Sequence, residues 1–222
     1  MGYKLVCFDV DGTLVDNVVY SWELFHDAFK VDMERRKKAK ESFYNKEISY
    51  LEWAKHDIKM WCEKKATKQQ FLDAIKKGRL KLMQGARETL GTLRSRGYKL
   101  AIISGSLNII LEALIPDYKD IFDDVFLSKL YFDEKGSISK VEATEYDMDG
   151  KAEALKMIAR REKIPLEECV FIGDHHNDVK IAEIAGLSIA FDAKDEELRR
   201  KADVVIDKKD LREILKPIIQ NG

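Results

Sequence analysis

Residues 6–16 read VCFDVDGTLVD, and this stretch decides the fold. It begins as an apolar, β-branched run and ends at an Asp-Gly pair, which is typical of a strand followed by a tight turn. Two carboxylates, Asp9 and Asp11, stand two residues apart at that turn, so they face the same way from an extended chain. Like charges this close repel each other unless a divalent cation or a bound proton intervenes. The stretch therefore predicts a strand that presents two acidic groups to a ligand.

The segment that follows is predicted to be helical. Residues 17–82 contain no convincing strand, and apolar side chains recur at helical spacing, as at Trp22, Phe25 and Phe29. We expect three or four helices here, inserted into the fold as a cap that closes over a site.

The sequence pattern changes after residue 82, where predicted apolar strands and helices alternate to the end of the chain. This alternation is typical of a parallel sheet covered on both faces, and right-handed crossovers make such a sheet doubly wound. We therefore predict an α/β fold with a Rossmann-like core from residues 1–16 and 83–222 and a helical cap from residues 17–82. A small β-hairpin is expected around residues 133–136.

The composition excludes several classes of protein. The chain has 222 residues, of which 45% are hydrophobic and 36% are charged, and this balance is ordinary for a globular protein. A formal net charge of -1 gives no general attraction to nucleic acid or to an anionic membrane. No apolar run reaches the ~18 residues that a membrane span needs. We therefore expect neither nucleic acid nor membrane as a partner, and a monomer or a homodimer.

Three cysteines, Cys7, Cys62 and Cys169, are odd in number and far apart in the sequence. This pattern predicts buried thiols in a reducing cytoplasm, not a disulfide set or a metal site. The N-terminus lacks the basic start and long apolar centre of a signal peptide. We therefore expect a cytoplasmic protein.

Polar residues cluster where the predicted strands end, and ligands of open α/β sheets bind beyond the carboxyl ends of strands. After VCFDVDGT, these clusters are IISGS at residues 102–106 and GDHHND at residues 173–178, and Lys151 opens a later helix. Carboxylates from several of these segments would converge, and all-oxygen ligands favour Mg²⁺. The candidate metal ligands are Asp9, Asp11, Asp174 and Asp178.

Hydroxyl, ammonium and amide donors in the same clusters would bind the phosphate group that Mg²⁺ prefers to share. The predicted phosphate- and substrate-binding residues are Gly12, Thr13, Ser104, Gly105, Lys151 and Asn177, with Tyr50 from the cap. Tyr44 is the second cap aromatic expected at the site. Lys129 and Lys140 are alternatives to Lys151.

The order of the residues assigns their roles in phosphoryl transfer, a reaction that depends mainly on the placement of charge. Asp9, nearest the strand, is the predicted nucleophile and would carry an aspartyl-phosphate. Asp11, in the turn beside another carboxylate, is the predicted general acid and base. Asp178 would hold metal-bound water or Lys151.

The segments DVDGT, IISGS, Lys151 and GDHHND, in this order, resemble the four motifs of the haloacid dehalogenase superfamily of phosphatases. The helical insert resembles the cap of the phosphoserine-phosphatase-like branch. The resemblance implies a Mg²⁺-dependent phosphatase that acts on a small phosphorylated metabolite, with phosphoserine as one candidate. It also implies metal ligands from Asp9, the Asp11 backbone carbonyl and Asp174.

Several positions depart from that branch. Ser106 and the pair His175-His176 stand where small residues are usual. The resemblance implies a glutamate that binds the substrate amine near position 18 and an arginine that binds the serine carboxylate near position 57, but this chain has Val18 and Asp57 there. Because a closing cap would hold the substrate away from bulk solvent, we expect substrate choice to reside in the cap.

Other interpretations stay open. The same site could serve a phosphotransferase or phosphomutase, or a regulatory phospho-acceptor domain. Ser104 could be only a helix N-cap, Lys151 only a surface lysine, and His175 and His176 only exposed loop residues.

Overall fold

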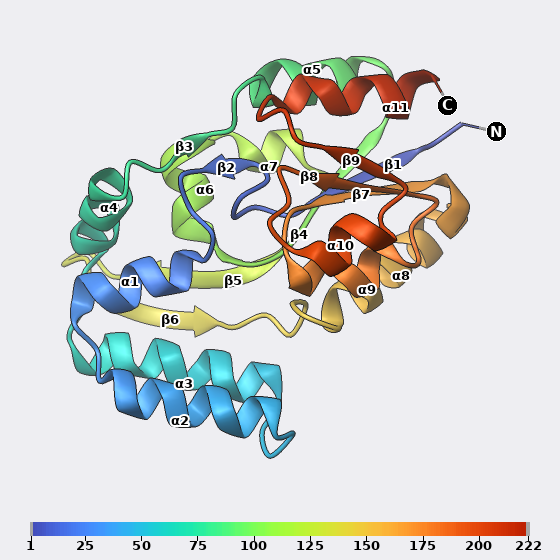
Figure 1. The fold of residues 1–222 in the computed structure, drawn as a ribbon. Helices are drawn as coiled ribbons and strands as arrows, with labels where there is room; N and C mark the ends of the chain where they lie inside the picture. The colour runs from blue at the N-terminus through green and yellow to red at the C-terminus, as the bar shows by residue number, and fades with distance from the viewer. Residues whose placement is uncertain (1, 221–222) are drawn as a thin grey trace.

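A seven-stranded sheet forms the centre of the molecule in the computed structural model, which describes residues 2–220 (Figure 1). Its order is β6-β5-β4-β1-β7-β8-β9, and every neighbouring pair except β5–β6 is parallel. Residues 1, 221 and 222, which the predicted core includes, lie outside the described residues. The strands of this sheet are β1 (Leu5–Phe8), β4 (Lys99–Leu107), β5 (Asp124–Phe132), β6 (Ile138–Glu142), β7 (Cys169–Gly173), β8 (Leu187–Phe191) and β9 (Val204–Ile206).

Helices cover both faces of this sheet, because side chains alternate along each strand. Val6 and Phe8 of β1 pack into one core cluster with α5, α6 and α11, while Leu5 and Cys7 pack into a second cluster with α8 and α9. The predicted doubly wound α/β fold is confirmed. The helices of the core are α5 (Ala86–Ser95), α6 (Asn108–Leu114), α7 (Tyr118–Ile121), α8 (Gly150–Glu162), α9 (Val179–Ala182), α10 (Glu196–Lys201) and α11 (Leu215–Gln220), with 3-10 turns at Leu166–Glu168, His176–Asp178 and Leu211–Ile214.

The predicted hairpin is the antiparallel pair β5–β6 at one edge of the sheet. Its turn is fixed by Asp133, whose Oδ1 accepts hydrogen bonds from the backbone N–H groups of Lys135 and Ser137. Gly136 closes the turn at a φ of 77°, a conformation that suits glycine. The hairpin prediction is therefore confirmed.

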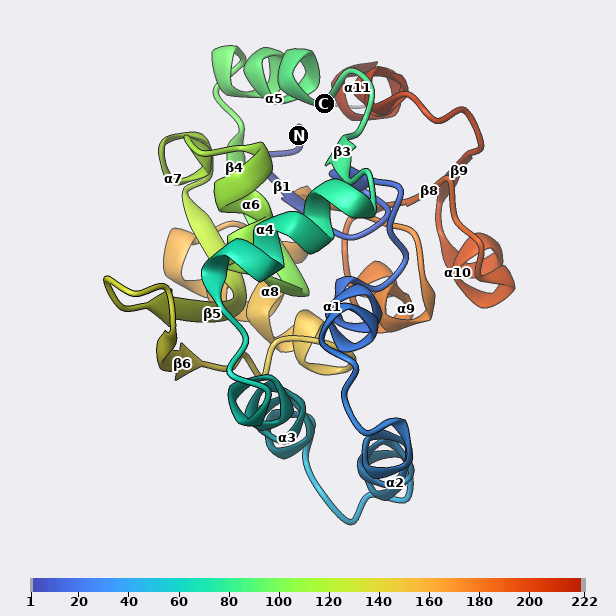
Figure 2. The same cartoon turned by 90° about the vertical axis from the view of Figure 1, so that its left-hand side faces the viewer.

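Four helices lie between two very short strands, β2 (Val15–Asp16) and β3 (Lys81–Leu82), which pair with each other. We call α1–α4 the cap helices; two views place the α2–α3 pair away from the sheet, with α1 nearer to it (Figures 1 and 2). The β2–β3 pair holds together the two ends of the helical segment, and the sequence pattern did not predict it. The division into core and cap at these points stays a prediction. The cap helices are α1 (Ser21–Phe29), α2 (Met33–Tyr44), α3 (Tyr50–Glu63) and α4 (Lys68–Lys77).

Local signals begin two of the cap helices. Ser49 and Glu52 form a reciprocal capping box at the start of α3, and Thr67 and Gln70 form another at α4. The interior between α1, α3 and α4 is aromatic, because Trp61 contacts rings from both neighbouring helices. These aromatic side chains belong to the same hydrophobic cluster as Val6 and Phe8 of β1, so the core continues from the sheet into the cap helices.

The prediction of three buried thiols is wrong for Cys62. Cys7 and Cys169 are buried in the sheet, whereas Cys62 is exposed on α3. Trp61 takes the inward position, and the next residue of a helix is turned by about 100° from it. Separately, within residues 2–220 we find no helix with both the length and the apolar character required to cross a bilayer.

Candidate active site

The register of the central strands brings three polar segments to one edge. Phe8, the last residue of β1, lies opposite Ile102 of β4 and Ile172 of β7. Asp9 continues this ladder, since its N–H donates to the Ile172 carbonyl at 2.9 Å. Ser104 lies within β4, two residues beyond Ile102, and Asp174 directly follows β7, two residues beyond Ile172, so both stand at the level of the end of β1.

Lys151 connects these segments through charge. It is the second residue of α8, and its side chain is fully buried. Its Nζ donates at 2.6 Å to Asp9 Oδ1 and at 2.6 Å to Asp178 Oδ1. The alternatives Lys129 and Lys140 lie on the exposed β5–β6 hairpin beside Glu142. Lys151 is therefore the lysine that reaches the acids.

Three carboxylates, from Asp9, Asp174 and Asp178, form a buried group that we call the carboxylate cluster. One oxygen from each lies within 4.8 Å of the others, which fits a single cation with oxygen ligands. Asp178 is also bonded through its second oxygen, which accepts the N–H groups of Asp174 and His175. Asp178 was predicted to hold either metal-bound water or Lys151. These contacts favour the second role, because Asp178 holds Lys151 and also the loop that contains Asp174 and His175.

The electrostatics of the cluster show a shortage of positive charge. Burial raises the pKa of Asp9 to about 8, although Lys151 lowers it in part. Burial and then the charges of Asp9 and Asp178 hold the pKa of Asp174 well above its usual range. Burial alone would lower the pKa of Lys151, but the adjacent carboxylates outweigh it and raise that pKa. A divalent cation would favour the ionised form of all three acids, so the residues present fit such an ion.

Asp11 lies apart from the carboxylate cluster and faces the cap. Its oxygens accept hydrogen bonds from Ser106 Oγ at 2.9 Å and from the Ser21 N–H of α1 at 2.7 Å. Burial raises the pKa of Asp11, and these hydrogen bonds lower it in part. The side chain is therefore not one of the converging carboxylates, and only its backbone carbonyl stays a predicted metal ligand. Ser106 was noted in the sequence only as a departure, and its contact with Asp11 was missed.

Hydroxyl groups lie beside these acids. Ser104 Oγ accepts the N–H of Ser106 at 3.1 Å, and its own O–H has no acceptor among residues 2–220, so this donor can serve a ligand. Thr13 is directed at Asp174, with 3.5 Å between its Oγ1 and the carboxylate. The role of Thr13 as a phosphate donor stays a prediction.

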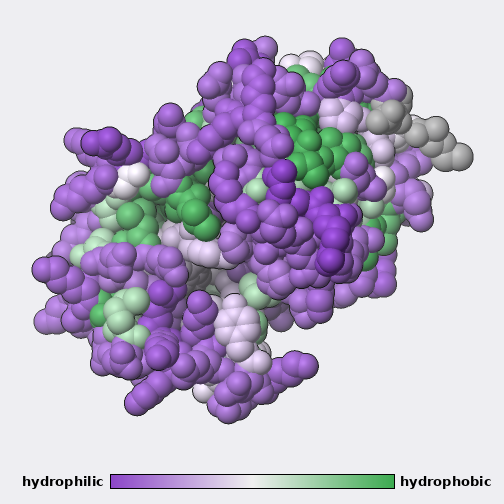
Figure 3. All heavy atoms as spheres, viewed as in Figure 1, coloured by the Kyte–Doolittle hydropathy of each residue, from purple (hydrophilic) through white to green (hydrophobic). Residues whose placement is uncertain are grey.

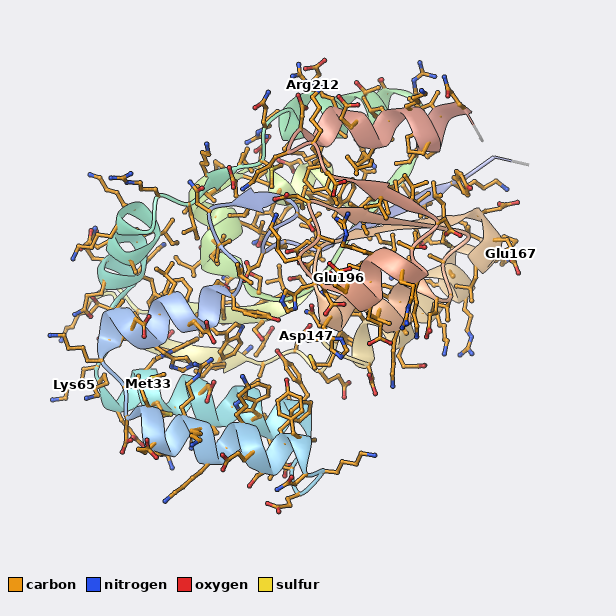
Figure 4. The ribbon with its side chains drawn as sticks, in the orientation of Figure 1. Met33, Lys65, Asp147, Glu167, Glu196 and Arg212 are labelled. Atoms are coloured by element: carbon orange, nitrogen blue, oxygen red, sulfur yellow. The ribbon has the colours of Figure 1, made fainter. Side chains whose placement is uncertain are left out.

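Asp147 is a further acidic residue at the site, and nothing in the sequence pattern indicated it. Its Oδ1 accepts a hydrogen bond from Asn177 Nδ2 at 2.8 Å and lies 3.8 Å from Lys151 Nζ. Figure 4 shows it in the segment between β6 and α8, facing the α2–α3 pair.

The nearby Gly105 carbonyl accepts the Trp22 indole N–H at 2.8 Å. Core and cap therefore meet directly around Gly105.

Gly12 has a positive φ of 80°, and a Cβ placed there would lie 2.2 Å from Asp174 Oδ2. We expect Gly12→Ala to lower the free energy of unfolding by about 1–2 kcal/mol through backbone strain, and to displace the Asp174 carboxylate as well. The Mg²⁺ concentration for half-maximal activity should rise by about tenfold or more. Urea unfolding and a Mg²⁺ titration measure the two effects.

The control for this change is Gly97→Ala, because Gly97 has a φ of 84° but no neighbouring atom within 4 Å of the place that a Cβ would take. Gly97→Ala should show the strain and no change in Mg²⁺ dependence. Equal Mg²⁺ dependence in both variants would contradict the close approach of Gly12 to a metal ligand.

A pocket of about 200 Å³ lies between the cap helices and the core, and the molecular surface is hollowed between the α2–α3 pair and the rest (Figure 3). Both cap tyrosines expected at the site line it. Burial and then the charge of Asp147 raise the pKa of Tyr50. The size suits a small metabolite. The lining residues are Tyr20, Trp22, Glu23, Arg36, Lys40, Tyr44, Tyr50, Trp53, Ala54, Asp57, Asp147, Met148, His175, His176 and Asn177.

The two histidines of the GDHHND segment differ in environment. His175 is half-buried and its Nδ1 lies 2.5 Å from the hydroxyl of Tyr20, which precedes α1. Burial lowers the pKa of His175. His176 is exposed beside Asp195 and Glu197. His175 is therefore a contact between core and cap, whereas His176 lies at the pocket mouth.

Comparisons with known proteins agree with this geometry. A sequence profile described as haloacid dehalogenase-like hydrolase matches residues 3–186. The phosphoserine phosphatase of Methanocaldococcus jannaschii is 36% identical over 219 residues, which are 97% of each chain. That of Archaeoglobus fulgidus is 32% identical over 208 residues, which are 94% of this chain and 58% of that one. A solved structure titled "Phospho-Aspartyl Intermediate Analogue of Phosphoserine phosphatase" has a TM-score of 0.73 and 33% identity, covering 98% of this chain and all (100%) of that one.

Proposed function

The chain belongs to the haloacid dehalogenase-like hydrolases and is a phosphatase, and from this premise we propose that Asp9 carries the phosphoryl group during hydrolysis of a small phosphorylated metabolite. One observation carries the proposal: Asp9 is buried where Lys151 Nζ, at 2.6 Å, and the carboxylates of Asp174 and Asp178 converge. A structural role alone gives no reason to bury three acids around one lysine, because each buried charge costs free energy. Phosphoryl transfer uses such a concentration of charge.

Asp9 is positioned for attack on phosphorus. Its backbone is held by the β1–β7 ladder, and Lys151 fixes one of its carboxylate oxygens. Lys151 and the free hydroxyl donor of Ser104 would hold the non-bridging phosphoryl oxygens. Attack by Asp9 forms the acyl-phosphate bond and breaks the bond to the alcohol oxygen, which needs a proton.

Asp11 is the proposed source of that proton. Its raised pKa, caused first by burial, favours the protonated form that a general acid needs. After the alcohol leaves, the ionised Asp11 would accept a proton from the water that hydrolyses the aspartyl-phosphate. Ser106 and the Ser21 N–H orient its carboxyl group.

Mg²⁺ is the proposed cofactor, with Asp9, Asp174 and the Asp11 backbone carbonyl as its protein ligands. When bound, it would supply positive charge to the phosphoryl oxygens. The carboxylate cluster supports this assignment, because Asp9 and Asp174 have raised pKa values and its acids have one cationic partner, Lys151.

Phosphoserine is the first substrate to test, because the relatives above carry that name. Val18 and Asp57 depart from the branch pattern, so a series of phosphorylated amino acids, sugars and nucleotides belongs in the same phosphate-release screen. Turnover on any of them with free phosphate as product supports hydrolysis. Transfer of phosphate to an added alcohol would favour the phosphotransferase, and a single burst without turnover would favour the regulatory phospho-acceptor.

Metal removal gives a separate prediction. Treatment with EDTA should reduce phosphate release by about 100-fold or more, and added Mg²⁺ should restore it, because the ion would then balance the negative charge of the phosphoryl oxygens.

Asp174→Asn should raise the Mg²⁺ concentration for half-maximal activity by about tenfold or more. The control Asp73→Asn, on the exposed face of α4, should leave that concentration unchanged. Full activity in EDTA would contradict the metal assignment.

A further inference from the structure

The carboxylate of Asp147 lies among residues that were predicted to bind phosphate or substrate. Its Oδ1 accepts a hydrogen bond from Asn177 Nδ2 at 2.8 Å and lies 3.8 Å from Lys151 Nζ. Its Oδ2 would lie 2.1 Å from a Cβ placed at Gly105, so the carboxylate packs against the backbone of that residue. An acidic side chain therefore takes a position that the proposed function gives to the oxygens of a phosphoryl group.

Lys151 does not require this carboxylate as a counterion. Its buried Nζ already has Asp9 and Asp178 at 2.6 Å each. At 3.8 Å, Asp147 is beyond hydrogen-bond length and is the third negative charge beside one cation. Like charges in a buried site repel each other, so Asp147 adds an unfavourable interaction to the folded protein. Natural proteins tolerate such conflicts mainly at functional sites.

Neutral donors hold Asp147 in this position. The Asn177 amide is one of them, and the hydroxyl of Tyr50, at the start of α3, is the other. Burial, then the charge of Asp147 and the hydrogen bond to it, raise the pKa of Tyr50. A phosphoryl oxygen would accept the hydrogen bond of the Asn177 amide in place of the carboxylate. Asp147 and a phosphate would therefore compete for the same donor.

Asp147 also separates the pocket from the phosphoryl site, since it lies between the core and the α2–α3 pair (Figure 4). Asp147 and Tyr50 both line the pocket. Among residues 2–220, the lining includes neither Asp9 nor Lys151. The side chain of Asp147 is only 12% exposed and approaches Lys151 from the side of the pocket. An ester that enters through the pocket therefore meets the Asp147 carboxylate before it reaches Asp9.

The segment that contains Asp147 has both strain and space beside it. Met148, the next residue, has a φ of 48°, in the left-handed region that side chains other than glycine rarely adopt. Such strain is frequent in segments that switch between conformations. The adjoining pocket of about 200 Å³ offers room for a displaced carboxylate. Loss of the contacts of Asp147 would therefore allow its segment to relax toward the pocket.

We propose that the Asp147 carboxylate is an intramolecular competitor of phosphate, which the phosphoryl group of the substrate must displace from Gly105 and Asn177. This rests on the proposed function, because it takes these residues as part of the phosphate site. The competition weakens the binding of every phosphate. It acts most on the inorganic phosphate left after hydrolysis, which has no alcohol part to contact the cap. Asp147 therefore favours release of the product.

The test measures the binding of inorganic phosphate in the presence of Mg²⁺ by isothermal titration calorimetry. Asp147→Asn removes the charge and keeps the shape, so it should bind phosphate roughly 10- to 100-fold more tightly than wild type, because a like charge beside the dianion is gone. The inhibition constant of phosphate in ester hydrolysis should fall by the same factor. Loss of a merely structural contact would weaken binding, so the sign of the change distinguishes the two roles.

A second variant keeps the test decisive if Asp147→Asn unfolds. Asp147→Ser also removes the carboxylate and should change phosphate binding in the same direction. The matched control is Asp149→Asn, because Asp149 lies in the same segment but pairs with Lys180 at the surface. It should bind phosphate as wild type does.

The outcomes separate the two proposals, because calorimetry does not depend on turnover. Binding by the Asp147 variants that is weaker than that of wild type, or tighter by less than about threefold, overturns the competition while hydrolysis stands. An equal gain in Asp149→Asn overturns it as well, because the effect would then be one of net charge. Failure of wild type to release phosphate from any ester overturns the proposed function, even where removal of Asp147 tightens phosphate binding.

Discussion

Replacing Asp9 by Asn is expected to lower phosphate release by about 10⁴-fold or more on every substrate. The amide keeps the shape of the side chain but is not a nucleophile, so no aspartyl-phosphate can form. The fold should be retained, because Lys151 keeps its bond to Asp178 and one buried negative charge is removed. The measurement is steady-state phosphate release together with urea unfolding of the variant.

A trapping experiment gives this prediction its sharpest form. Wild-type enzyme quenched in acid during turnover of a ³²P-labelled ester should carry label in a base-labile bond, and Asp9→Asn should carry none. Asp73→Asn is the control for a change of Asp to Asn on an exposed helix, and it should label as wild type does. Label retained on Asp9→Asn, or turnover within tenfold of wild type, would remove the proposed mechanism.

Replacing Lys151 by Met is expected to reduce both activity and stability. Activity should fall by about 100- to 1000-fold, because a preorganised positive group on the phosphoryl oxygens is lost. The free energy of unfolding should fall by roughly 3–5 kcal/mol in EDTA, since Asp9 and Asp178 remain buried without their cation. Added Mg²⁺ should recover part of the stability, because it neutralises the same carboxylates.

Lys156→Met is the matched control, on the same helix and with the same change of side chain. Lys156 pairs with Glu153 at the surface, and such pairs contribute up to about 1 kcal/mol. Urea unfolding with EDTA and with Mg²⁺ compares the two variants. If both unfold at the same urea concentration and both remain active, Lys151 does not balance the charge of the carboxylate cluster.

Much of the site could be predicted because its chemistry lies in short segments. The turn that ends β1 places Asp9 and Asp11, and the capping boxes of α3 and α4 depend on residues three apart. The β2–β3 pair was not predictable in this way. Each strand has two residues, too few to show a period, and the pair joins Val15 to Leu82.

The sequence predicted the helix α3 correctly, but it did not predict which side chains of that helix are exposed to solvent. Cys62 follows the buried Trp61 and is exposed, because the direction in which α3 faces is set by its packing on α1 and α4 and not by residue type. His175 likewise contacts Tyr20 of the cap, although its sequence context fits an exposed loop equally well.

The sequence by itself determined the alternation of strands and helices and indicated a helical segment after the first strand and the acids of the carboxylate cluster, though not Asp147, because periodicity and turn chemistry are local properties of a chain. Only the tertiary structure decided that Ser106 binds Asp11 across 95 positions and that Lys151 reaches Asp9 across 142. It also decided that the guanidinium of Arg36 lies beside Asp57 without a hydrogen bond. Such contacts join residues that are far apart in the sequence. They depend on how helices and strands pack in three dimensions, which a pattern of neighbouring residues does not show.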